Sequence, residues 1–226
     1  MVTIKTQLAN RGNYGSTRST KDIKYIVIHY TANDGDTDEN NGKYFANNVV
    51  QVSAHYFVDD DSITQSVPDN YVAWHCGTKY TYKHKKCRNT NSIGIEICDD
   101  VKDGKVYPSA KTIQNALELT EYLMNKYSIP KENVIRHYDV TGKACPMYWC
   151  GTAEKENKWK TEFWNKLKSG KIKNETTSKT TAGKMYRIFN TSNKQLGAYS
   201  VVDNVLNDAK KRLLNGEDVK LTVRNK

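Results

Sequence analysis

The sequence predicts an α/β domain with a mixed central β-sheet flanked by helices, followed by a small C-terminal α+β module. Strand-like and helix-like hydrophobic periods alternate along residues 1–170. Residues 171–183 are rich in Lys, Thr, Ser and Asn and almost lack apolar side chains, which is typical of a linker. Strand and helix periods resume over residues 184–226. We therefore expect two domains joined by this linker.

Several strands are expected in the first domain. Residues 25–30 form a short apolar run rich in β-branched side chains, as in a buried strand. Residues 54–58 and 62–67 flank three aspartates, a pattern typical of a hairpin. Residues 93–98 alternate strictly, so their isoleucines face one side of a sheet and the intervening residues face the other.

Two helices are expected after these strands. Ser109 is a candidate N-cap for the first helix, which ends before Pro130. Residues 159–167 carry a large apolar side chain at every fourth position, with Gly170 as a candidate C-cap. One face of the first helix is largely apolar: Ile113, Ala116, Leu117, Thr120, Leu123 and Tyr127.

The C-terminal module is expected to be β-α-β-like. Residues 185–189 and 219–223 have strand patterns, and residues 202–213 carry a helical apolar stripe. Residues 171–226 contain twelve Lys and Arg against five Asp and Glu, so most of the chain's formal net charge of +10 lies there. Such a tail suits a polyanionic partner, although charge alone does not name one.

Composition also excludes some protein classes. No run of about 18 apolar residues occurs, so membrane insertion is not expected. The N-terminus is polar and shows no apolar segment of a signal peptide, so we expect synthesis in the cytoplasm. Five cysteines, an odd number, argue against a disulfide framework.

Metal-ligand residue types occur at or just beyond the predicted strands. His29 ends one strand, while His137 and Cys145 lie close together on a later segment. Catalytic zinc sites take three protein ligands and leave a fourth position for water. These residues would fit that pattern. By residue type alone, however, a structural histidine and a buried cysteine are the commoner cases.

The order of the motifs is more specific than any one of them. After the strand ending in His29 come SAHY at 53–56, WHCG at 74–77, NSIGIE at 91–96 and HYDVTGKACP at 137–146. This series resembles the zinc-dependent N-acetylmuramoyl-L-alanine amidases, a family that includes peptidoglycan recognition proteins and many phage endolysins. The resemblance covers residues 23–151.

The resemblance implies a peptidoglycan-recognition-protein-like fold and roles for individual residues. It implies one zinc ion per chain, held by His29, His137 and Cys145. Glu96 matches a general base for the attacking water, and Lys143 matches a lysine that stabilises the oxyanion. Some members place a tyrosine just before the histidine of the second motif. Ala54 stands there in this chain, which favours Glu96 as the base.

The implied substrate is peptidoglycan, cut at the amide bond between N-acetylmuramic acid and L-alanine. His75 matches a position in the substrate groove of the family. Trp74 could stack on sugar rings, although large aromatic residues more often serve packing. His75 and Trp74 are therefore our candidate substrate-binding residues.

We expect an endolysin of a phage with a Gram-positive host, released to the cell wall by a holin. Its tail, residues 184–226, would bind the wall, with an anionic secondary wall polymer as one ligand and self-association as an alternative. A bacterial autolysin would normally carry an export signal. A non-catalytic peptidoglycan receptor commonly lacks the cysteine ligand. Nucleic-acid binding is not expected, because no helix-turn-helix, RNP or zinc-finger spacing occurs.

Overall fold

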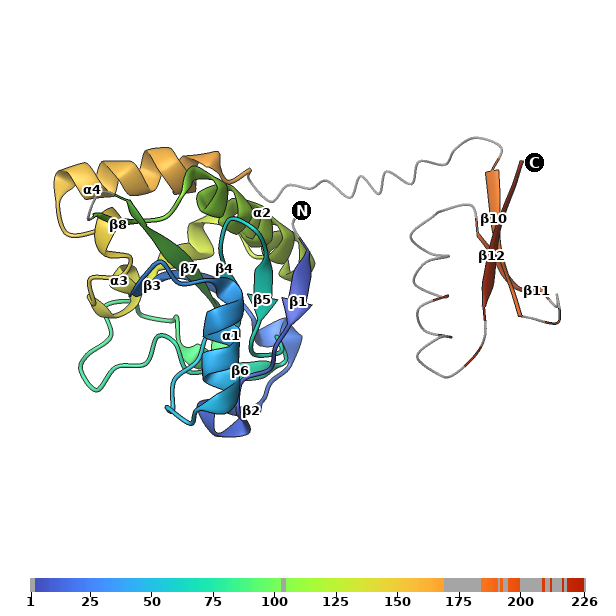
Figure 1. The fold of residues 1–226 in the computed structure, drawn as a ribbon, viewed down its shortest axis with the longest axis horizontal. Helices are drawn as coiled ribbons and strands as arrows, with labels where there is room; N and C mark the ends of the chain where they lie inside the picture. Colours follow the sequence, from blue (N-terminus) through green and yellow to red (C-terminus); the bar gives the residue numbers. More distant parts are fainter. Residues whose placement is uncertain are drawn as a thin grey trace. The chain divides into compact units, whose positions relative to one another are not determined.

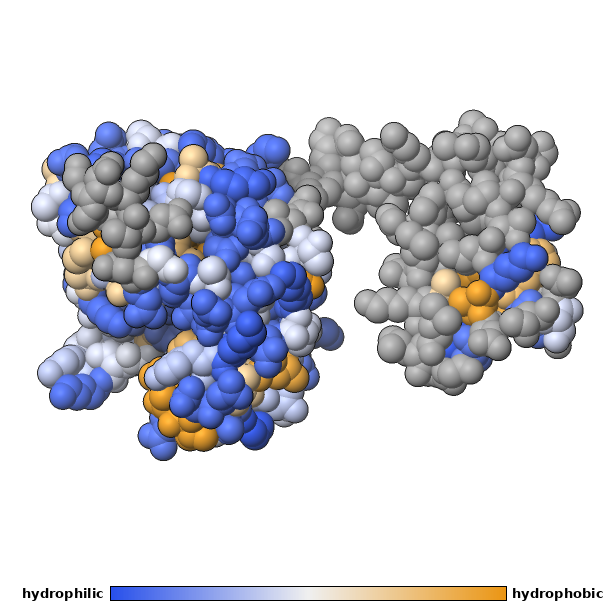
Figure 2. All heavy atoms as spheres, in the orientation of Figure 1, coloured by the Kyte–Doolittle hydropathy of each residue, from blue (hydrophilic) through white to orange (hydrophobic). Residues whose placement is uncertain are grey.

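The chain forms two compact units, Met1–Gly170 and Lys171–Lys226. The computed structural model (Figure 1) describes residues 3–102, 105–168, 184–190, 192, 195–199, 209, 212, 217 and 219–225. The predicted linker at residues 171–183 lies outside the described residues. Within the described part of the chain, no helix is both long and apolar enough to span a bilayer. The face of the first unit drawn in Figure 2 is mostly hydrophilic.

A seven-stranded mixed sheet forms the centre of the first unit. Its strand order is β1-β5-β4-β7-β3-β9, with β8 paired to β7 beside this path. β3 runs parallel to both β7 and β9, while β4 and β5 form the predicted antiparallel hairpin. The strands are β1 (Ile4–Thr6), β3 (Tyr25–Asp34), β4 (Tyr56–Val58), β5 (Ile63–Gln65), β7 (Ser92–Lys102), β8 (Lys105–Tyr107) and β9 (Val134–Arg136). A separate two-stranded ribbon joins β2 (Tyr14–Thr17) and β6 (Tyr71–Ala73).

Helices cover both faces of this sheet (Figure 1). They are α1 (Asp38–Asn47), α2 (Ala110–Tyr127), α3 (His137–Thr141) and α4 (Ala153–Lys158). The isoleucines of β7 share one core with α2. Phe45 of α1 packs with Phe57 and Cys98, which lie on the opposite face of their strands. The alternation along β7 therefore separates two layers of packing, as its sequence predicts.

The predicted helix at α2 is confirmed. The Ser109 hydroxyl accepts a hydrogen bond from the Thr112 N–H at 3.0 Å, and the helix ends at Tyr127. Ser128 follows in the left-handed conformation, with φ at 53°. The first unit therefore gains its longest helix from a local cap and one apolar face.

The apolar stripe at residues 159–167 is buried as expected, but it is not one regular α-helix. α4 ends at Lys158 and continues as a π-helical turn (Trp159–Phe163) and a 3₁₀ turn (Trp164–Lys166). The rings of Trp159 and Phe163 stack at 5.2 Å with an interplanar angle of 13°. The two rings thus pack together on a π-helical turn, and the hydrophobic period of the sequence does not distinguish this turn from an α-helix. Gly170 lies outside the described residues.

The second unit contains an antiparallel sheet with strand order β11-β10-β12. β10 (Lys184–Phe189) and β12 (Lys220–Asn225) confirm the two predicted strands. β11 (Gln195–Tyr199) was not predicted, because its short QLGAY run is interrupted by a glycine. The predicted helix at 202–213 lies outside the described residues, apart from Ala209 and Arg212, which are helical. Ile188 and Ala209 are buried together there.

Candidate metal centre

The sheet register brings three of the predicted site residues together. His29 on β3 pairs with Glu96 on the parallel strand β7. On the other side of β3, Ile28 pairs with Arg136, the last residue of β9. His137 follows Arg136 directly, so its ring lies next to that of His29, with ring centroids 4.7 Å apart. Two histidines 108 positions apart in the chain thus become neighbours through backbone pairing.

A closed loop returns the chain from His137 to Cys145. The short helix α3 ends at Thr141 and is followed by Gly142, whose φ of +85° suits glycine. The Tyr138 N–H then donates to the Cys145 carbonyl at 2.9 Å. This bond ties the two ends of the loop together and leaves Cys145 Sγ 3.7 Å from His29 Nδ1.

Buried Arg136 anchors this loop to the rest of the first unit. Its guanidinium donates to Asp139 Oδ1 at 2.7 Å and to the Trp149 carbonyl. It also pairs with Glu156 at 2.9 Å. Arg136 thus ties Asp139 of the loop to Trp149 and Glu156, which follow the loop in the chain. These contacts restrict the positions available to His137 and Cys145.

The geometry of this cluster fits a metal ion. His29, His137 and Cys145 are all buried, and one ligand atom from each lies within 4.8 Å of the others. Within the described residues, no other set of three or more His, Cys, Asp or Glu side chains meets this condition. His137 Nδ1 is buried and has no hydrogen-bond partner among the described residues. Two imidazoles and one thiol form a donor set that suits zinc.

Burial sets the protonation of these three side chains. It lowers the pKa of His29 well below the usual range, with His137 as the next cause. Burial, and then the positive charge of Lys143, lower the pKa of His137 to about 4. Both imidazoles are thus neutral at pH 7, as metal ligands must be. Burial raises the pKa of the Cys145 thiol, so this group must lose its proton when it binds a metal.

Glu96 and Lys143 lie at the same pocket, of about 180 Å³, as the three ligand residues. Glu96 Oε1 is 3.9 Å from His29 Nδ1, and its side chain is 20% exposed. Glu96 Oε2 is buried without a hydrogen-bond partner among the described residues. Burial raises the pKa of Glu96 to about 8, while the charge of Lys143 opposes this shift. A carboxyl with such a pKa can both accept and return a proton near neutral pH.

A larger groove of about 650 Å³ adjoins this pocket. Its lining includes Tyr80, which is 75% exposed, and Asn89. The two hollows share five lining residues: Val52, Trp74, His75, His137 and Lys143. The candidate metal position is therefore reached from an open groove with polar and aromatic walls.

Comparison with known proteins identifies the family. The Amidase_2 family, described as N-acetylmuramoyl-L-alanine amidase, matches residues 19–148, which is more than half of the chain. The chain belongs to this amidase family. Its His29, His137 and Cys145 form the triad that is typical of zinc amidases.

Curated relatives of this amidase-family chain include proteins of Bacillus. The N-acetylmuramoyl-L-alanine amidase CwlL of Bacillus licheniformis is 38% identical over 168 residues, which cover 71% of this chain and 44% of CwlL. CwlA of Bacillus subtilis (strain 168) is 30% identical over 224 residues, covering 96% of this chain and 76% of CwlA. The chain spans less than half the length of the first three curated relatives it matches.

Solved structures of similar proteins confirm the predicted fold class. The structure of PlyL is 31% identical, with a TM-score of 0.60, and covers 76% of this chain and 100% of its own. The catalytic domain of XlyA is 30% identical, with a TM-score of 0.57, and covers 71% and 97%. The mixed sheet with flanking helices is thus the fold that these amidase structures share with this chain.

The structure groups every residue that the sequence singled out for the site. Trp74 and His75, the candidate substrate-binding residues, line both the pocket and the groove. The contacts behind the site, which involve Ser92 and Gly94, were not predicted from the sequence. One signal for them existed, because a glycine inside a β-branched strand often marks a close approach by another group.

Proposed function

We propose that this chain is a zinc-dependent N-acetylmuramoyl-L-alanine amidase that cuts peptidoglycan between N-acetylmuramic acid and L-alanine. The observation that carries this proposal is the buried His29, His137 and Cys145 triad, which shares one pocket with a carboxyl and a lysine. Membership of the amidase family supports the substrate and the bond. The second candidate function, a non-catalytic receptor, is disfavoured because all three ligand residues are present.

The side chains around the triad divide the chemistry of amide hydrolysis. Zinc held by the triad would polarise the scissile carbonyl and lower the pKa of the attacking water. Glu96 accepts the proton of that water and returns it to the leaving amine. Burial raises the pKa of Glu96 to about 8 without the metal, and the charge of a bound cation would lower it, which favours the carboxylate form that accepts the proton. Lys143 lines the same pocket and offsets the negative charge that develops on the carbonyl oxygen.

The adjoining groove suits an extended muropeptide. Trp74 and Tyr80 offer aromatic surface for a sugar ring, while Asn89 and Thr141 offer polar groups for peptide. Because the groove and the pocket share Trp74 and His75, a substrate lying in the groove places its amide near the triad.

The test measures which bond is cut in purified Gram-positive cell walls. An amidase releases new amino groups on L-alanine, whereas a glycosidase releases reducing ends and an endopeptidase exposes other amino acids. We expect wild type to release L-alanine amino termini and to carry about one zinc per chain. Cys145→Ser should lose both the alanine release and the bound zinc. Cys150→Ser, in the same loop region, should keep the alanine release and the zinc. Zinc-loaded wild type that binds walls without releasing alanine would instead support the receptor function.

We further infer that the enzyme acts as an endolysin. Its similarity to a solved structure titled "Mutant endolysin from Bacillus subtilis", at 31% identity and a TM-score of 0.58, supports this. The test is expression inside a Gram-positive host, with and without a separate membrane-permeabilising protein. An endolysin lyses the cells only after the membrane is opened. Appearance of the enzyme in the medium while the membrane is intact would indicate an autolysin.

The second unit, Lys171–Lys226, is proposed to bind an anionic polymer of the wall. Its basic composition and its separation as a compact unit support this proposal. The full chain should sediment with walls at low salt, and less after the anionic polymers are extracted. Lys220→Glu should weaken sedimentation, whereas Lys160→Glu in the first unit should not. Concentration-dependent dimers without wall binding would favour self-association.

A further inference from the structure

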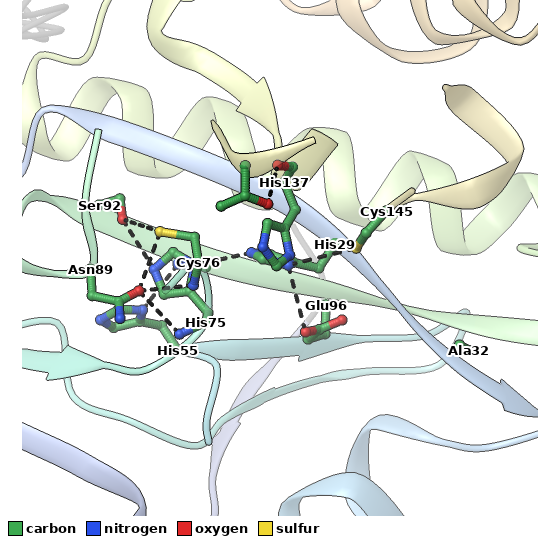
Figure 3. Close-up of polar contacts among 12 residues, drawn as sticks. His29, Ala32, His55, His75, Cys76, Asn89, Ser92, Glu96, His137 and Cys145 are labelled. Atoms are coloured by element: carbon green, nitrogen blue, oxygen red, sulfur yellow. Dashed lines mark hydrogen bonds and ion pairs between the residues drawn. The ribbon is translucent and has the colours of Figure 1, made fainter. Parts of the chain in front are cut away.

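A chain of buried hydrogen bonds runs from the metal centre into the protein (Figure 3). His29 Nε2, on the far side of the ring from Cys145, lies 3.0 Å from His75 Nδ1. His75 Nε2 lies 3.0 Å from Ser92 Oγ. The Ser92 hydroxyl in turn lies 2.7 Å from the Arg88 carbonyl oxygen. Each link joins residues distant in sequence, except the last.

The direction of this chain follows from its last link. A carbonyl oxygen can only accept, so the single proton of the Ser92 hydroxyl is donated to Arg88. Ser92 Oγ must then accept from His75 Nε2, which makes His75 the Nε2–H tautomer. His75 Nδ1 is left as an acceptor, and the group that donates to it is His29 Nε2–H. A neutral imidazole carries only one N–H, so His29 Nδ1 keeps its lone pair.

That lone pair faces a second candidate ligand, Cys145, and the candidate base, Glu96. Cys145 Sγ is 3.7 Å from His29 Nδ1, and Glu96 Oε1 is 3.9 Å from the same atom. The nitrogen that the hydrogen-bond chain leaves free is therefore the one on the metal side. Were the chain reversed, Nδ1 would carry the proton and His29 could not bind a metal through it.

The surroundings of His75 hold its ring in this position. A Cβ placed on Gly94 of β7 would lie 2.6 Å from His75 Cγ, so the ring rests directly on the strand backbone. The N–H groups of His75 and Cys76 both donate to Asn89 Oδ1, at 3.2 and 2.8 Å. The neighbouring Cys76 thiol donates to Asn89 Oδ1 at 3.2 Å and lies 3.8 Å from Ser92 Oγ, farther from it than His75 Nε2 or the Arg88 carbonyl oxygen.

We propose that His75 is a positioning residue that acts with Ser92 to hold His29 as the Nε2–H tautomer, with Nδ1 ready for the metal. This inference rests on the proposed metal-dependent function. It assigns His75 a role through His29, in addition to its place in the groove wall. Hydrogen bonds of this kind to metal-bound histidines typically change metal affinity by about 10–100-fold.

The first measurement is the tautomer of His29 in metal-free wild type, read from long-range ¹H–¹⁵N correlations of the imidazole rings. We expect protonated Nε2 on both His29 and His75. A protonated Nδ1 on His29 would overturn the proposal. This measurement needs no substrate and no activity, so it is independent of the amidase assay.

The second measurement is the zinc dissociation constant, obtained by competition with a chromophoric chelator. Asn and Leu have similar shapes, but only Asn offers an acceptor near the position of His75 Nδ1. His75→Leu and Ser92→Ala should weaken zinc binding by about 10-fold or more, and His75→Asn should weaken it less. Ser66→Ala is the matched control, because Ser66 Oγ is equally buried but has no hydrogen-bond partner among the described residues.

The outcomes separate this inference from the proposed function. If wild type binds zinc and cuts walls while His75→Leu and Ser92→Ala match Ser66→Ala, the inference alone is wrong. If wild type binds no zinc, the inference and the proposed function are both wrong. Thermal unfolding of each metal-free variant checks folding. Should His75→Leu not fold, Ser92→Ala and the wild-type tautomer still decide the question.

Discussion

His29 and Glu96 are paired residues on adjacent parallel strands, and their side chains meet at the metal pocket with Nδ1 and Oε1 3.9 Å apart. One residue is the candidate metal ligand and the other the candidate base. Their separation is therefore set by the hydrogen-bond ladder between β3 and β7 rather than by a loop. Such placement on rigid strands favours a constant distance between base and metal.

Glu96→Gln separates proton transfer from metal binding. The amide is almost isosteric with the carboxyl but cannot accept the proton of the attacking water. We expect kcat to fall by about 100- to 10,000-fold while the zinc content stays near wild type. The measurement is alanine release by variants of verified metal content, with Glu132→Gln as the surface control. Full activity of Glu96→Gln would remove Glu96 from the mechanism.

Lys143→Met removes the positive charge and keeps much of the side-chain volume. If the ammonium group stabilises the oxyanion, kcat should fall by about 100- to 1,000-fold, with a small change in KM. Lys160→Met is the control, because Lys160 lies on the π-helical turn after α4 and does not line the pocket. A rise in KM with unchanged kcat would show that Lys143 binds substrate instead.

Zinc binding should release protons, and the number depends on Glu96. At pH 7 both histidines are neutral, while the pKa of the Cys145 thiol is raised and that of Glu96 is about 8. The thiol must lose its proton to bind, and the cation also favours loss of the Glu96 proton. We expect about two protons per zinc in wild type and about one in Glu96→Gln.

The pH dependence of zinc affinity follows from this count. Because protons are released, apparent affinity rises with pH, by about 100-fold per unit in wild type and about 10-fold in Glu96→Gln near pH 7. Calorimetry in buffers of different ionisation enthalpy measures the proton number directly. Equal values for the two proteins would mean that Glu96 does not change its protonation state when zinc binds.

Gly94→Ala should disturb the packing behind the metal centre. The added Cβ would lie 2.6 Å from His75 Cγ, so either the ring or strand β7 must shift. We expect a loss of about 1–3 kcal/mol in the free energy of unfolding, together with weaker zinc binding. Gly77→Ala is the control, since its Cβ would meet only Asn89 Nδ2 at an ordinary 3.4 Å. Chemical denaturation of both metal-free variants provides the comparison.

Much of the fold followed from local patterns. The strand predicted from the alternating isoleucines of β7 and the helix start predicted at Ser109 were both confirmed. Each of these patterns depends only on near neighbours in the chain. β1 was missed because its three residues are not part of a longer strand-like pattern. β11 was missed because its short QLGAY run is interrupted by a glycine. The π-helical turn at Trp159–Phe163 was missed because a stripe at every fourth position fits more than one helix type.

The sequence by itself determined the residue types and the order of the motifs, and hence the family and the candidate ligands His29, His137 and Cys145. Only the tertiary structure decided how those ligands are supported. Hydrogen bonds have direction, and the proton on His29 depends on His75 and Ser92, which lie 46 and 63 positions away in the chain. No local pattern carries that information, because it arises when the register of β3 and β7 and the packing on Gly94 bring the rings together.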